Sequence, residues 1–123
     1  MKKIAKHLPL LIVSLLITSF TCMAQDAASA KPVMKTYVIE RNIPGAGQFS
    51  PEKLKDISKT SCTVLKEMGP QIQWIQSYVT GDKIFCVYKA ENIELIKEHA
   101  KKGGFPANNI YEVSTVISPA TAN

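Results

Sequence analysis

Two helix-like segments, each lying between strand-like segments, limit what this sequence can fold into more than any other feature. Four segments rich in β-branched and aromatic side chains predict strands: 34–41, 72–79, 83–90 and 110–117. Ser50 and Pro51 predict the start of a first helix, which Gly69-Pro70 ends. Residues 91–102 predict a second helix, with acidic side chains early and lysines late. The predicted order is strand, helix, strand, strand, helix, strand.

This order predicts an α+β fold, a ferredoxin-like βαββαβ sandwich over residues 34–118. Thr80-Gly81-Asp82 is typical of a tight turn that joins the two middle strands into a hairpin. Right-handed crossovers then give the antiparallel sheet the order 4-1-3-2 and place both helices on one face. The opposite face of the sheet has no predicted element left to cover it.

Residues 1–24 are predicted to be a signal peptide. Three lysines come before an apolar run over residues 8–20, and Cys22 and Ala24 supply small side chains before a cut. The apolar run has 13 residues, fewer than the ~20 of a membrane-spanning helix, so no stable membrane insertion is expected after cleavage. We expect a periplasmic or secreted protein. A lipoprotein anchored through Cys22 is the alternative, which the bulky Phe20 disfavours.

The positive charge of the chain belongs mostly to this leader. Cleavage after Ala24 removes three of the 15 basic side chains and leaves 12 basic and 10 acidic ones in 99 residues. Such a chain is long enough for one domain and gives no basis for a nucleic-acid partner. We expect residues 25–33 to be a flexible lead and residues 119–123 a disordered tail.

The uncovered face of the predicted sheet carries more apolar surface than suits a monomer. A two-residue turn pairs Tyr78 with Phe85 and Trp74 with Lys89, which places three aromatic rings on that face. We therefore expect a homodimer through this open face. The residues expected there are Glu40, Trp74, Tyr78, Phe85 and Glu112.

His99 is the one histidine that remains after export. Near the end of the second helix, an imidazolium would complement the helix dipole. The residues three and four positions away on the helix are not metal ligands, so a metal at His99 would need ligands from another element or another subunit.

Cys62 in the first helix and Cys86 in the third strand leave three readings open. They are unpaired core thiols, a disulfide formed in an oxidising compartment, or part of a shared metal site. No Cys-x-x-Cys or Cys-His spacing strengthens the metal reading.

Glu40 and Glu112 are expected on adjacent antiparallel strands, where two carboxylates in an apolar cleft could act as a general acid or base. Their ordinary interpretation is as solvated or ion-paired side chains. No nucleophile elbow and no Ser-His-Asp pattern is recognisable, so no catalytic residue and no enzyme activity is expected.

Several stretches resemble a small bacterial family, formerly catalogued as a domain of unknown function, whose characterised type is a nickel-binding protein. The most distinctive are Trp-x-x-Ser-Tyr at residues 74–78 and Gly-Gly-Phe-Pro-Ala at residues 103–107. The others lie at 37–41, 44–47, 61–62, 83–88 and 98–102. The resemblance implies a ferredoxin-like subunit, a homodimer and Ni²⁺ at the dimer surface.

Among the matching residues, His99 is the only imidazole, which suits a borderline ion such as Ni²⁺, and Glu98 could complete an open site. The resemblance thus implies binding of a divalent metal at the surface, and the single histidine of the mature sequence indicates that this binding is weak. Two other functions stay open: a module that binds a protein partner without metal, and a small-molecule or catalytic cleft on the open face, as in dimeric α+β barrels.

Overall fold

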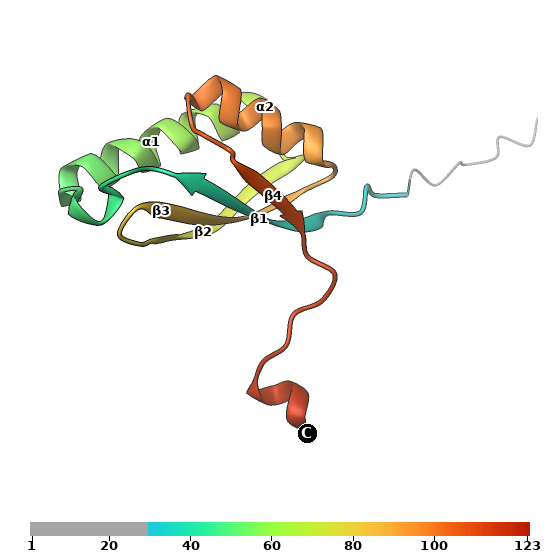
Figure 1. Ribbon diagram of the computed structural model, residues 1–123. Helices are drawn as coiled ribbons and strands as arrows, with labels where there is room; N and C mark the ends of the chain where they lie inside the picture. The colour runs from blue at the N-terminus through green and yellow to red at the C-terminus, as the bar shows by residue number, and fades with distance from the viewer. Residues whose placement is uncertain (1–29) are drawn as a thin grey trace, which may run out of the picture. The chain divides into compact units, whose positions relative to one another are not determined.

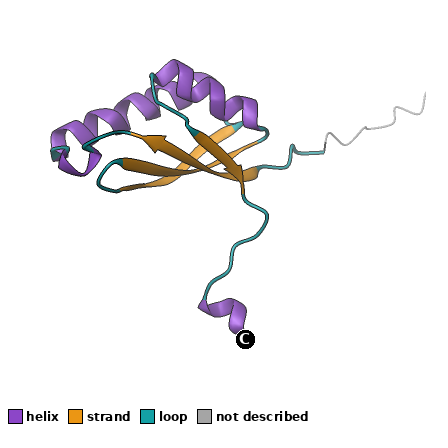
Figure 2. Ribbon diagram, in the orientation of Figure 1, coloured by secondary structure: helices purple, strands orange, loops and turns teal. Residues whose placement is uncertain are grey.

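The computed structural model describes residues 30–123, so the predicted signal peptide, Cys22 and most of the lead lie outside the described residues. Residues 35–112 form a four-stranded antiparallel sheet in the order β2-β3-β1-β4, with both helices on one of its faces (Figures 1 and 2). This is the predicted α+β class and strand order. The elements are β1 (Lys35–Asn42), α1 (Pro51–Met68), β2 (Ile72–Val79), β3 (Lys83–Ala90), α2 (Ile93–Gly103) and β4 (Asn109–Glu112), with short 3-10 helices η1 (Ala46–Gln48) and η2 (Pro119–Ala122).

Both helices begin at residues whose side chains cap them. The Ser50 hydroxyl accepts a hydrogen bond from the backbone N–H of Lys53, and Pro51 occupies the first turn of α1 as predicted. In α2 the Asn92 side chain accepts from the N–H of Leu95. The second helix therefore starts at Ile93, two residues later than the sequence indicates. Among the described residues, no helix is long and apolar enough to cross a membrane.

The last strand is shorter than predicted and ends at Glu112 instead of Ile117. Its partner is β1, with Tyr37 opposite Glu112 and a further backbone hydrogen bond from Val113 to Thr36. Because β1 begins at Lys35, the residues after Val113 have no strand beside them to bond with. Residues 114–123 are all exposed, including η2.

The predicted register of the hairpin is correct near the turn and wrong at the far end of the two strands. Tyr78 lies opposite Phe85 as predicted, but a β-bulge at Ile75 shifts the pairing, so that Trp74 lies opposite Tyr88 instead of Lys89. One extra residue in a strand moves every side chain beyond it to the other face. Trp74 therefore packs on the helix side of the sheet, where its ring stacks on Tyr88 with centroids 6.5 Å apart. Its predicted place on the open face is wrong.

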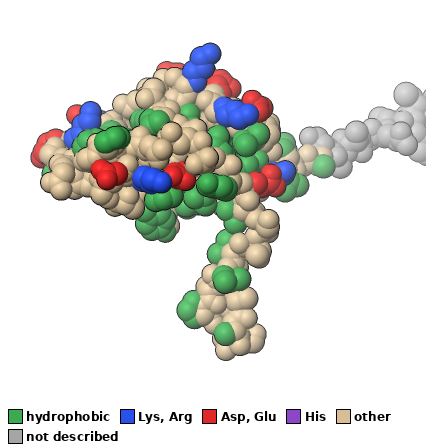
Figure 3. Space-filling model, viewed as in Figure 1, with side chains coloured by type: hydrophobic (Ala, Val, Ile, Leu, Met, Phe, Trp, Pro, Cys, Tyr) green, Lys and Arg blue, Asp and Glu red, His purple; other side chains and the backbone are tan. Residues whose placement is uncertain are grey.

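Glu112 is also on the other face from the one predicted, because its partner on β1 is the buried Tyr37. The aromatic residue of β4 on the open face is Tyr111, opposite Val38. The corrected apolar set of the open face is Val38, Tyr78, Phe85, Val87 and Tyr111. Hydrophobic side chains are visible along the side of the sheet away from the helices in Figure 3. Tyr78 and Tyr111 are 55% and 54% exposed.

Candidate functional site

Four polar side chains are buried between the helices and the sheet. Ser61 comes from α1, His99 from α2, Arg41 from β1 and Tyr88 from β3, and each is at most 4% exposed. On α2, His99 lies three residues after the buried Ile96 and directly before the buried Ala100, so it belongs to the apolar stripe of that helix. Polar groups at such depth need partners, because burial without a hydrogen bond is costly.

Ser61 joins the two aromatic members of this buried cluster. Its hydroxyl lies 3.0 Å from the Tyr88 hydroxyl and 3.1 Å from Nε2 of His99. The other ring nitrogen of His99, Nδ1, is buried and has no hydrogen-bond partner among the described residues. The rings of Tyr88 and Phe105 lie against the imidazole, with centroids 5.0 and 5.6 Å away.

Arg41 enters the same cluster from the middle of the sheet. Its Nε donates to Sγ of Cys86 at 3.3 Å, and its Nη1 donates to the carbonyl of Pro106 at 2.6 Å. Its guanidinium also lies over the ring of Phe105, 5.4 Å from the centroid. No carboxylate among the described residues forms an ion pair with it.

The turn after α2 sets the position of Phe105. Gly104 has φ +69°, a left-handed conformation that ends the helix and suits glycine. A Cβ at Gly103 would come within 2.3 Å of the Phe105 ring, so the ring folds back over the helix end only because residue 103 has no side chain. The predicted helix stop therefore also places the ring that covers His99 and Arg41.

Burial fixes the charge state of the two aromatic polar groups. Desolvation, with a smaller contribution from the nearby Arg41 cation, lowers the pKa of His99 to about 4. Burial raises the pKa of Tyr88 to about 12, although its hydrogen bond to Ser61 acts in the opposite direction. At neutral pH both groups are uncharged, and the imidazolium expected from the sequence at the end of α2 is not formed.

A cavity of about 150 Å³ lies beside this cluster. Arg41, Ser61, Cys86 and Tyr88 line it, but His99 does not. The rest of its wall comes from α1, β2, β3 and two loops: Ile43, Leu54, Ile57, Ser58, Trp74, Ser77, Val79, Ile84 and Phe105. Val79, at the β2 side, is 42% exposed, so we infer that solvent reaches the cavity there.

The two cysteines are not brought together. Both are free, with Cys62 exposed on α1 and Cys86 buried on β3. Of the three readings, the unpaired core thiol describes Cys86, which also accepts the hydrogen bond from Arg41.

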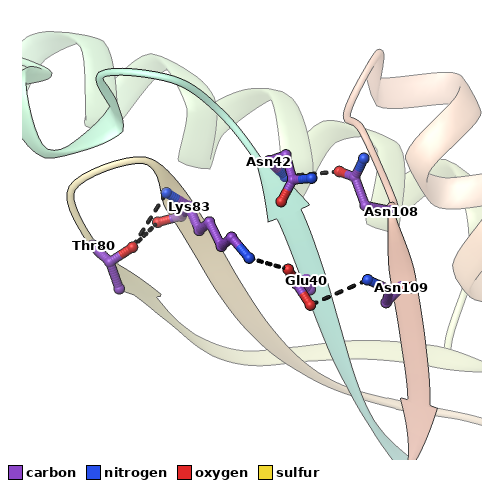
Figure 4. Close-up of polar contacts among 6 residues, drawn as sticks. All are labelled: Glu40, Asn42, Thr80, Lys83, Asn108 and Asn109. Carbon is purple, nitrogen blue, oxygen red and sulfur yellow. Dashed lines mark hydrogen bonds and ion pairs between the residues drawn. The ribbon is translucent and has the colours of Figure 1, made fainter.

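Glu40 and Glu112 do not form a carboxylate pair, because Glu40 lies opposite Asn109 on β4. Glu40 binds Lys83 and accepts from Asn109 Nδ2 at 3.2 Å, as Figure 4 shows. The bond from Lys83 is the main reason that the pKa of Glu40 is lowered, whereas a general acid needs a raised one. Glu112 pairs with Lys35 at 3.1 Å. The acid–base interpretation is therefore wrong.

The predicted metal ligands also point apart. His99 is 1% exposed and its Nε2 already has Ser61 as a partner, while Glu98 lies on the outside of α2 in an ion pair with Lys102 at 3.1 Å. Among residues 30–123 there is no group of three or more His, Cys, Asp or Glu side chains that could hold a metal ion. The Arg41 cation contributes to the lowered pKa of His99, and the same positive charge disfavours Ni²⁺ at this ring. The side chains of residues 30–123 in a single chain therefore do not fit a resident nickel site.

Residues 37–113 match a protein family described as nickel responsive protein SCO4226-like. The chain belongs to this family of nickel-responsive proteins. A crystal structure of SCO4226 from Streptomyces coelicolor A3(2) has a similar fold, with a TM-score of 0.57 and 15% sequence identity over 67% of this chain and 99% of that one. No curated protein matches the sequence. The family resemblance inferred from the sequence is thus confirmed.

We did not predict from the sequence that Arg41, Ser61 and Tyr88 belong to one buried cluster with His99. A signal was present, since Ser61 and His99 both interrupt the apolar stripe of a helix. Two polar residues on stripes that face the same sheet indicate a buried hydrogen bond between the helices. Arg41 follows Tyr37 and Ile39 with the period of two that marks one strand face, and this pattern places it inward.

The neutral state of His99 makes the stability of the fold depend on pH. The unfolded chain protonates His99 below its ordinary pKa of 6.5, whereas the folded chain does so only below about 4. The unfolded state therefore binds more protons between these values, and the free energy of unfolding falls as the pH falls from 6.5 to 4. At 1.36 kcal/mol per pKa unit, the loss in the free energy of unfolding is roughly 3 kcal/mol.

Urea denaturation between pH 6.5 and pH 4 measures this loss. His99→Gln should remove that part of the pH dependence and leave the part due to carboxylates. Parallel curves for the two proteins would contradict the assignment.

Proposed function

We propose that this chain is a binding protein that takes a small organic molecule into the cavity beside α1. The observation that carries the proposal is the composition of the cavity wall, in which apolar side chains surround a few convergent polar groups. This is the usual make-up of a small-molecule site. The cavity lies on the helix side of the sheet, so the cleft expected on the open face is not the one proposed.

The buried cluster supports binding better than catalysis. Ser61 and Nε2 of His99 are 3.1 Å apart, as in a nucleophile and its general base. However, no carboxylate orients the ring, because Nδ1 has no partner among the described residues. A base with a pKa of about 4 also removes protons poorly at neutral pH. The contact between Ser61 and His99 is best explained as a structural hydrogen bond.

Trp74 is the one tryptophan of the chain and it lines the cavity, so its fluorescence reports occupancy. A cavity of ~150 Å³ is large enough for a benzene ring. We expect benzyl alcohol to change the Trp74 emission saturably and to raise the melting temperature. Ser58→Phe, which fills the cavity from α1, should weaken binding at least tenfold. Lys55→Phe on the exposed side of α1 is the matched control and should bind as the wild type does. A linear, non-saturating response in all three proteins would overturn the proposal.

We also propose that the protein is exported and works as a homodimer through its open face. The lysines and the apolar run within residues 1–24 support export, and an intact mass of the exported chain that lacks these residues would confirm their removal. The dimer is supported by the apolar side chains that the uncovered face presents, such as Val87, Tyr78 and Tyr111.

Light scattering tests the dimer. Val87→Asp puts a charge in the middle of the open face and should give a folded monomer with unchanged circular dichroism. Trp74→Asp is the counterpart on the helix side and should instead unfold the domain, because its ring packs on the core. A wild-type protein that is monomeric at all concentrations would refute the dimer.

Weak binding of Ni²⁺ at the surface is a second candidate function, and membership in the nickel-responsive family favours it. The accessible donor of the pair expected from the sequence is Glu98, since His99 is buried. A single exposed carboxylate with water gives low affinity, which agrees with the weak binding expected from the sequence.

Calorimetric titration of Ni²⁺ separates these residues. We expect a dissociation constant on the order of millimolar, because a carboxylate offers oxygen ligands and not the imidazole nitrogen that suits Ni²⁺. His99→Gln should leave it unchanged, and Glu98→Gln should weaken it. If His99→Gln abolishes the heat instead, the metal reaches the interior and the assignment to the surface is wrong.

A further inference from the structure

The cavity beside α1 contains one charged group. Of its 13 lining residues, only Arg41 is ionised at neutral pH. Tyr88 is neutral, and burial raises its pKa further. The remaining lining residues are apolar side chains, hydroxyls and the Cys86 side chain. The electrostatic character of the cavity is therefore that of a single buried cation.

That cation lacks a counter-charge. Arg41 is 3% exposed, and its two hydrogen bonds go to a sulfur and a peptide carbonyl. Removing a guanidinium from water is unfavourable, and a buried charge is ordinarily paired with an opposite one. Among the described residues no carboxylate lies within ion-pair distance of it. A guanidinium has five N–H donors in a planar fork, so it can still bind a carboxylate in the cavity.

We propose that the ligand of this cavity is a small organic carboxylate whose anionic end pairs with Arg41 and whose apolar end lies against Leu54, Ile57 and Trp74. This inference rests on the proposed function of the cavity and names the chemical class of its ligand. Ser61 and Tyr88 line the same cavity as Arg41. When Nε2–H of His99 donates to the Ser61 hydroxyl, and that hydroxyl donates to the Tyr88 oxygen, the Tyr88 O–H stays free to donate to the ligand.

Benzoate and benzyl alcohol test the class of ligand, because they share the ring and differ in charge. Titration of each probe is followed by Trp74 fluorescence. In the wild type we expect benzoate to bind at least tenfold more tightly, since hydrogen bonds to an anion are stronger than neutral ones. In Arg41→Gln, which keeps donors but removes the charge, the two affinities should become equal. Arg41→Lys keeps the charge without the fork and should retain part of the preference.

The outcomes separate the inference from the function on which it rests. If benzyl alcohol binds saturably and benzoate binds no tighter, the cavity is a ligand site but the carboxylate inference is wrong. If neither probe binds, the proposed function fails as well. If Arg41→Gln does not fold, as judged by circular dichroism, the test rests on two other proteins. The ratio of the benzoate affinity to the benzyl alcohol affinity is then compared between the wild type and Arg41→Lys. Equal affinities in both of those proteins would overturn the role of Arg41.

Discussion

The burial of one cation, Arg41, organises the helix side of this sheet. The guanidinium sits on a central strand, and two other segments supply its surroundings: Cys86 from β3, and Phe105 and Pro106 from the turn after α2. Its field also helps to keep His99 neutral, and a neutral imidazole can share Ser61 with Tyr88. Polar groups thus join helix α1, helix α2 and the sheet, in addition to apolar packing. Three of these groups, Arg41, Ser61 and Tyr88, line the cavity beside α1.

Buried polar groups of this kind impose a cost that the fold must recover elsewhere. Among residues 30–123, Nδ1 of His99 has no hydrogen-bond partner and Arg41 has no ion-pair partner, and both situations are unfavourable. A hydrophobic core of the same shape would be at least as stable, so stability alone does not explain this arrangement. A bound anion does explain the charge, because it turns an isolated cation into an ion pair. The same reasoning does not extend to nickel, since a positive ion would add to the charge that is already there.

Element order and strand order were predictable because they depend on local patterns: caps at Ser50, stops at Gly69 and Gly103, and a turn at Gly81. Side-chain direction was predictable only where the strand alternates without interruption, as it does in β1 and β3. The bulge at Ile75 has no signature such as a glycine, so an uninterrupted alternation put Trp74 on the wrong face. The end of β4 depends on where β1 begins, which is a long-range property. The site was harder still, because its members come from four elements and are each ordinary residues in their own segments.

The bulge that misplaced Trp74 also affects the outer edge of the sheet. β2 is an edge strand, and its side away from β3 carries backbone N–H and C=O groups that another extended chain could bond. A bulge twists the strand and breaks the regular spacing of those groups, so a second strand cannot continue the ladder in register. Trp74 and Ser77, on either side of the bulge, are joined by a hydrogen bond of 2.9 Å that holds the distortion in place. The edge beside the mouth of the cavity is therefore protected against strand addition, the route by which small β-rich proteins aggregate into fibres.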